Sequence, residues 1–129
     1  MFRTFLATAG VALLAGCAAN GGSPKRAAAL QSTQPVLYLS IRSAEQVYAC
    51  VKPTVDNWGS VADVAGFPAE KRVDITVYED RFPQPRQDYY LVRIEPTPGG
   101  SATRFFDNGM NHPRVPAEKV EDVLRGCTT

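Results

Sequence analysis

The chain has 129 residues with 14 basic and 13 acidic side chains, which gives a formal net charge of +1. This length suits one domain, and 44% apolar with 21% charged residues is ordinary for a globular protein and untypical of collagens, coiled coils or disordered chains. The balanced charge argues against a nucleic-acid-binding protein, because such proteins carry a basic surface.

The chain begins with a segment of secretory character. Residues 1–16 hold one charge, Arg3, followed by an apolar run from Leu6 that ends in small residues. The run is too short to anchor a protein as a membrane-spanning helix. It predicts a signal peptide over residues 1–16, which is removed on export and takes no part in the fold.

The end of this segment, Leu14-Ala15-Gly16-Cys17, resembles the lipobox of bacterial lipoproteins. In that family signal peptidase II cuts directly before the cysteine, so the resemblance implies that Cys17 becomes the mature N-terminus and carries the lipid. The alternative is an ordinary signal peptide that happens to contain a cysteine. Acyl chains contribute about 0.8 kcal/mol per buried methylene, so two or three of them would hold the protein at a membrane.

The residues after Cys17 bear on location and organisation. An Asp directly after the lipidated cysteine commonly retains lipoproteins at the inner membrane, and Ala18 stands at that position here. The resemblance therefore implies the outer membrane, facing the periplasm, with surface exposure left open. Residues 17–34 are small and polar and predict a flexible tether, so that residues 35–129 form a single domain.

A first helix is predicted to begin at Ser43, because Ser43-Ala44-Glu45-Gln46 matches a capping box. Pro53 kinks or ends such a helix, but later apolar residues stay in helical phase, and we expect a kinked helix to about Trp58. The apolar face comprises Val47, Cys50, Val51 and Val55.

After this helix the spacing of apolar residues changes from the helical period to an alternation of apolar and polar residues. Val73 to Val77 and Tyr89 to Ile94 predict two strands, and Ser101 to Phe106 predicts a third after a Pro- and Gly-rich turn. Residues 36–39, ahead of the first helix, are interpreted only as an extended segment that packs at the edge of the sheet.

A last helix is predicted after Pro116, with Val120, Val123, Leu124 and Cys127 on one stripe. In an exported chain, Cys50 and Cys127 remain as an even pair after Cys17, which predicts a disulfide between the two helices. Closing this loop of 77 residues stabilises the fold by about 4.5 kcal/mol in the chain-entropy model.

These elements predict an α+β fold in which two helices cover one face of a three-stranded antiparallel meander, in the order α-β-β-β-α. The layout resembles small uncharacterised lipoproteins of proteobacterial genomes and prophages. That resemblance implies a location and a fold and no activity.

The sequence offers little catalytic chemistry. The single His, His112, lies in a loop before a proline, where exposed polar surface is the usual role, and we find no nucleophile elbow, phosphate loop or dinucleotide fingerprint. One His and two paired cysteines do not suit zinc, and the acidic pairs lack calcium-loop spacing. We therefore expect no cofactor and no metal.

Two regions are candidates for contact with a protein partner. The segment joining the first two predicted strands holds Arg81, Phe82 and Arg86 among prolines, which is typical of interface residues, although a plain hairpin is the simpler interpretation. If the second face of the sheet is open, Tyr89 and Phe105, with Leu91, form an exposed patch. The alternative is that these aromatic residues only stabilise neighbouring strands.

The sequence thus leaves two hypotheses. The first is a lipid-anchored, non-catalytic envelope module that binds a protein partner, as an inhibitor, an immunity protein or an exclusion factor would, with no role for nucleic acid. The second is a glycan- or cell-wall-acting enzyme, or a small-ligand binder, that relies on carboxylates alone. Its candidates are Glu79, Asp80, Asp88, Glu95 and Asp107.

Overall fold

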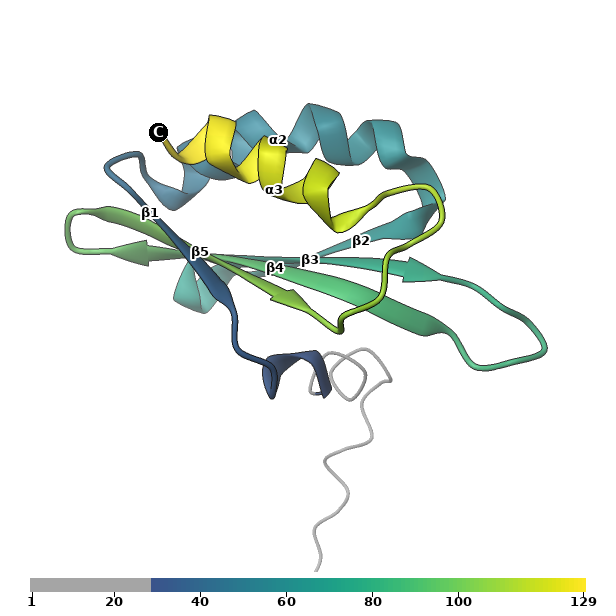
Figure 1. The fold of residues 1–129 in the computed structure, drawn as a ribbon. Coiled ribbons are helices and arrows are strands. Elements are labelled where there is room, and N and C mark those ends of the chain that lie inside the picture. Colours follow the sequence, from purple (N-terminus) through teal and green to yellow (C-terminus); the bar gives the residue numbers. More distant parts are fainter. Residues whose placement is uncertain (1–28) are drawn as a thin grey trace, which may run out of the picture.

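The computed structural model describes residues 29–129, and the predicted signal peptide, Cys17 and most of the tether lie outside them. The described residues form a five-stranded antiparallel sheet in the order β1-β5-β4-β3-β2. Helices α2 and α3 lie side by side on one face of this sheet (Figure 1). The elements are β1 (Val36–Ser40), α2 (Ala44–Trp58), β2 (Ala62–Phe67), β3 (Arg72–Glu79), β4 (Gln87–Thr97), β5 (Gly100–Asp107) and α3 (Ala117–Thr128).

The predicted three-stranded meander is wrong, because β1 and β2 add a strand at each end of the sheet. The three predicted strands are its centre, β3 to β5. The prediction missed β1 because its partner lies far along the chain, where Val36 is paired with Phe105. It missed β2 because Ala, Asp and Gly in this strand have low strand propensity and do not alternate.

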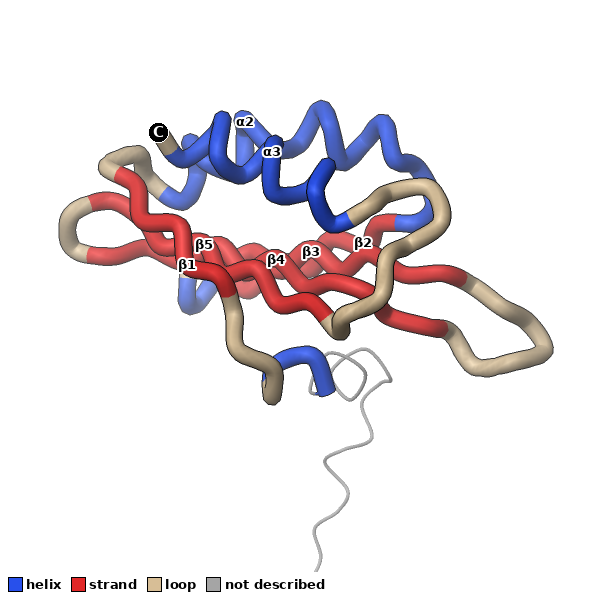
Figure 2. The backbone as a smooth tube through the Cα atoms, in the orientation of Figure 1, coloured by secondary structure: helices blue, strands red, loops and turns tan. Residues whose placement is uncertain are grey.

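Helix α2 forms as its sequence predicts. The Ser43 side chain accepts a hydrogen bond from the Gln46 backbone, the Gln46 side chain accepts one from the Ser43 backbone, and the helix continues past Pro53 to Trp58. It crosses the helix-covered face from the β1 end to the β2 end, so its buried residues meet several strands (Figure 2).

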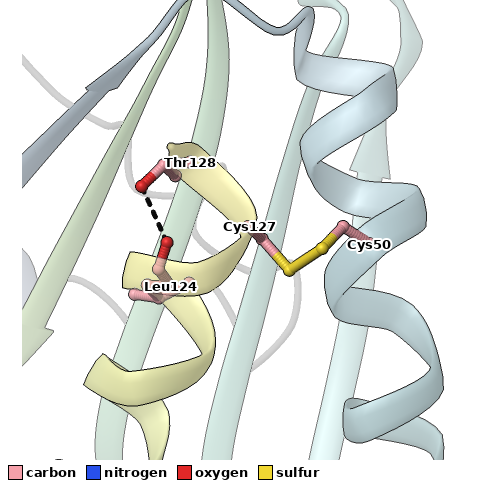
Figure 3. The surroundings of a disulfide bond; sticks show 4 residues. All are labelled: Cys50, Leu124, Cys127 and Thr128. Carbon is pink, nitrogen blue, oxygen red and sulfur yellow. Dashed lines mark hydrogen bonds between the residues drawn. A yellow bond between two sulfur atoms is a disulfide. The ribbon is translucent and has the colours of Figure 1, made fainter.

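The disulfide between Cys50 and Cys127 is confirmed and joins α2 to α3, with 5.6 Å between the two Cα atoms (Figure 3). Cys127 is buried on the inner stripe of α3, whereas Cys50 is exposed on α2. Beside the bond, Thr128 Oγ1 donates a hydrogen bond of 2.7 Å to the Leu124 carbonyl. The disulfide thus joins the two helices of this layer, and its Cys50 end faces solvent.

The main core lies between the helices and the sheet. Its strand residues follow the pairing register, since Ile75 lies opposite Val92 and Val92 lies opposite Phe105. The helices contribute the apolar stripes that the sequence predicts, except that Cys50, which was predicted on the apolar face of α2, is exposed. The largest fully buried side chains of this core are Tyr90, Phe105, Ile75, Ile94 and Leu124.

A second, smaller cluster lies on the opposite face of the sheet. Leu30, in a short helical turn at residues 29–31, is 3% exposed and packs with Leu91 and Phe106. The end of the predicted tether therefore contacts the sheet, as the dark blue turn below the strands shows in Figure 1.

Strand β1 is fixed to β5 at its C-terminal end. A Cβ atom on Gly100 would lie 2.1 Å from the Ser40 carbonyl oxygen, so only glycine allows this approach. Ser101 Oγ then donates a hydrogen bond of 2.8 Å to the Arg42 carbonyl.

Candidate interaction surfaces

The hairpin between β3 and β4 extends beyond the sheet and the helices, where both Figures 1 and 2 show it as a long loop. Phe82 is 88% exposed on this hairpin. The side chain of Arg81 is about half exposed, and its Nε lies 4.0 Å from a carboxylate oxygen of Glu79. These two predicted contact residues are therefore accessible to a partner.

Arg86, the third predicted contact residue of the segment, is held inside the protein. Its side chain is 16% exposed and donates hydrogen bonds of 2.8 Å to Asp88 and 2.7 Å to Asp63, and its guanidinium lies 3.8 Å from the Tyr78 ring centroid. Burial alone lowers the pKa of Arg86, but the hydrogen bonds to the two carboxylates outweigh it, so the pKa is raised. Arg86 fixes the base of the hairpin to β2 and β4.

The predicted aromatic patch is wrong, because the structure buries all of its members. Tyr89 is 5% exposed and Phe105 is 2% exposed, and both belong to the core beneath the helices. Phe105 lies there because it pairs with Val92, and Leu91 on the other face is covered by Leu30.

Tyr89 points inward because the register of β3 and β4 shifts between Val77 and Tyr78. A β-bulge adds one residue and so breaks the alternation of faces. Tyr89 and Tyr90 both join the main core, with ring centroids 6.2 Å apart. The Tyr89 hydroxyl donates to Glu79, and burial followed by this hydrogen bond raises the pKa of Tyr89.

His112 is buried rather than exposed, contrary to the expectation from its loop. It is 3% exposed, and its Nδ1 accepts hydrogen bonds from the backbone of Arg114 at 3.0 Å and of Val115 at 3.2 Å. Its Nε2 lies 3.0 Å from the Tyr78 carbonyl. Because Nδ1 accepts and a carbonyl only accepts, the ring is neutral with its proton on Nε2. His112 thus holds the loop that leads into α3.

The Tyr90 hydroxyl holds the same loop. It donates a hydrogen bond of 2.8 Å to the Val115 carbonyl and accepts one of 2.9 Å from the His112 backbone. Burial raises the pKa of Tyr90. Asn111 completes the connection, because its Oδ1 accepts a hydrogen bond of 2.9 Å from the Ala117 backbone at the start of α3.

Four of the five candidate carboxylates, Glu79, Asp80, Asp88 and Asp107, lie at the same end of the sheet, and Glu95 lies near the other end of β4. Asp88 is bound to Arg86, Glu95 to Arg104, and Asp107 accepts a hydrogen bond from the Gly109 backbone. Glu79 and Asp80 do line one depression, of about 270 Å³, together with Ser60, Val61, His112, Pro113 and Arg114. Among residues 29–129, no cluster of His, Cys, Asp and Glu side chains has the composition of a metal site.

The face of the sheet opposite the helices carries ion pairs between strands. Arg93 donates to both oxygens of Asp74 at 3.0 and 2.9 Å, and Arg104 pairs with Glu95. The hydrogen bond to Asp74 is the main cause of the raised pKa of Arg93. This face is polar at its centre, and Leu30 covers its apolar part.

Sequence reasoning missed the most apolar exposed surface, which is β1 and the residue that follows it. Leu39 is 68% exposed and Ile41 is 91% exposed. The signal was present in the sequence, because residues 36–41 contain no charged side chain.

Comparison of the chain with protein-family models, with curated proteins and with solved structures gives no match in any of the three. Within residues 29–129 no helix has the length and apolar character needed to cross a bilayer.

Proposed function

We propose that this protein is an envelope lipoprotein, anchored through Cys17 at the outer membrane and facing the periplasm, whose folded domain binds a protein partner. The lipobox resemblance at Leu14 to Cys17 supports the anchor and the location. The exposed tip of the β3–β4 hairpin supports binding to a protein.

The observation that carries this proposal is Phe82, 88% exposed on a hairpin whose base is fixed. Arg86 forms ion pairs with Asp63 and Asp88 at that base. A partner that contacts Phe82 therefore binds a hairpin whose base is held in one position. An aromatic side chain beside an arginine is a common source of binding energy at interfaces, and an ordered loop loses less entropy on binding.

The test is affinity purification of the tagged, full-length protein from cross-linked envelopes. We expect one dominant partner with the wild-type chain, and its recovery to fall with Phe82→Ala or Arg81→Ala. Met110→Ala is the matched control, because Met110 is an exposed apolar residue on a different loop. A partner retained equally by Phe82→Ala and Met110→Ala would contradict the role of the hairpin.

The anchor has its own control. Cys17→Ala should release the protein from membranes and leave the fold of residues 29–129 unchanged. Membrane association that persists in Cys17→Ala would contradict the lipid anchor, whatever the partner experiment shows.

A carboxylate-based glycan or cell-wall activity is the second candidate, favoured by the joint position of Glu79 and Asp80 in one depression. Glu79 is already engaged by the Tyr89 hydroxyl, which leaves Asp80 as the freer of the two. Binding of purified peptidoglycan fragments that is lost in Asp80→Asn and kept in Phe82→Ala would favour this candidate over the protein partner.

A further inference from the structure

Strand β1 presents an unprotected apolar edge. Within residues 29–129 it pairs with β5 on one side and with no strand on the other. Four of the eight exposed large apolar side chains of the described residues lie on it or directly after it: Val36, Leu37, Leu39 and Ile41. An open edge offers backbone donors and acceptors to another strand, and here apolar side chains surround them.

Natural edge strands are usually blunted by a charge, a proline or a bulge. Strand β1 has the sequence Val-Leu-Tyr-Leu-Ser, without charge or proline, and its register with β5 runs unbroken from Val36 to Ser40. Strand β2, at the other end of the sheet, contains Asp63 and is followed by Pro68. The two edges therefore differ in whether they accept a further strand.

We propose that β1 pairs antiparallel with β1 of a second copy of this chain, about a two-fold axis close to Tyr38. In this arrangement Leu37 of each copy lies opposite Leu39 of the other, so apolar side chains meet on the face away from the helices. An interface with two-fold symmetry uses the same patch twice and must be complementary to itself. An uncharged strand with leucines on both sides of its centre meets this requirement.

The charges beside β1 are of both signs. Helix α3 contacts β1, and on this helix Arg125 is paired with Asp122 of the same chain. The two-fold axis sets the two α3 helices antiparallel at this edge, so a helix surface with charges of both signs meets the same surface of the second copy.

The same geometry limits the assembly to two copies. Pairing at β1 leaves a β2 strand at each outer edge of the joined sheet, where Asp63 opposes further addition of strands. The hairpins with Phe82 stay free, because β5 and β4 separate β1 from β3 in the sheet order. The dimer does not depend on the proposed partner binding and would present two copies of that hairpin.

The test measures the mass of the protein purified with its own N-terminal segment, in detergent, by light scattering coupled to size-exclusion chromatography. We expect the wild-type chain to have twice the monomer mass and Leu39→Lys to have the monomer mass at the same concentration. Phe82→Lys is the matched control, because it also places a lysine at an exposed apolar position and should remain a dimer. A wild-type monomer, or a Leu39→Lys dimer, would overturn the proposal.

Cross-linking in cells distinguishes a second copy from a strand of another protein. Cys50 and Cys127 are paired in a disulfide, so added cysteines at positions 37 and 39 can be oxidised without competition from them. We expect the double variant Leu37→Cys/Leu39→Cys to give a disulfide-linked homodimer, because each added cysteine lies opposite the other one of the second copy, and Phe82→Cys to give none. The double variant linked to a different protein, or homodimers formed equally by it and by Phe82→Cys, would overturn pairing through β1.

Discussion

The two edges of the sheet differ in sequence, in exposure and in what holds them. At one edge, β1 is uncharged, and Leu39 is 68% exposed. At the other, β2 contains Asp63, which is paired with Arg86 from the base of a hairpin. Both strands are edges of the same sheet, so an edge position alone does not explain why they differ in charge and exposure.

A short strand is therefore defined by its neighbours as much as by its own residues. Strand β2 pairs with β3 and is also joined to the base of the β3–β4 hairpin by the ion pair between Asp63 and Arg86, whereas β1 joins β5 through backbone pairing and the close approach at Gly100. Strand β1 therefore keeps its apolar side chains available.

Both edges rely on a helical layer that the disulfide joins. Replacing Cys50 and Cys127 with serine should lower the free energy of unfolding by about 4.5 kcal/mol, because the unfolded chain regains the entropy of a long loop. Urea denaturation measures this loss, and reduction of the wild-type protein should reproduce it. A loss below about 1 kcal/mol would show that the cross-link does not constrain the unfolded chain in this way.

The β2 edge can be broken at Arg86. Arg86→Met should lower the free energy of unfolding by about 3 kcal/mol, because Asp88, with a side chain 7% exposed, loses its cation. Asp63→Asn is the control and should cost less than about 1 kcal/mol, because Asp63 is half exposed. Equal losses in the two variants would contradict the assignment of the larger effect to the buried carboxylate.

The loop that places α3 over the β1 end of the sheet can be loosened at Tyr90. Tyr90→Phe removes a hydroxyl that serves two backbone groups, and we expect a loss of about 2 kcal/mol in the free energy of unfolding. Tyr48→Phe, on α2, is the control and should cost less. Thermal or urea unfolding of the two variants provides the comparison.

Stability should also fall in alkali. The pKa values of Tyr38, Tyr89 and Tyr90 are raised above 10.0 in the folded protein, and burial is the first cause for each. The unfolded chain therefore loses these protons first, so stability is complete below about pH 10 and falls as the pH rises further. Unfolding midpoints between pH 8 and pH 11 test this, and Tyr90→Phe should show a shallower fall.

The smallest effect on stability is expected at the β1 edge itself. Leu39→Lys should change the free energy of unfolding of the monomer by about 0.5 kcal/mol or less, because the side chain is largely exposed. A large loss of stability, measured by urea unfolding at low protein concentration, would mean that Leu39 supports the fold and is not free for a second strand.

The sequence allowed prediction of local structure and of the disulfide. The capping box at Ser43, the alternation in β3 to β5 and the stripe of α3 depend on residues close together in the chain. Strand β1 could not be predicted as part of the sheet, because Val36 pairs with Phe105 and only the tertiary fold brings them together.

The site predictions failed for two identifiable reasons. The bulge beside Tyr78 turns Tyr89 inward, and alternation alone cannot reveal a one-residue shift. Which face of the sheet Phe105 occupies depends on its pairing with Val92, and this pairing cannot be predicted from the sequence of β5. Phe82, a predicted contact residue, is exposed in the structure, since a proline-rich hairpin has no neighbouring layer to cover it, and its contact with a partner stays a prediction.

The most direct test of the contrast between the edges is hydrogen–deuterium exchange of the backbone amides of β1 and β2 at low and high protein concentration. We expect protection of the β1 amides to rise with concentration and protection of the β2 amides to stay constant. Equal behaviour of the two edges, with either both or neither gaining protection, would contradict the conclusion that β1 alone is open to a further strand.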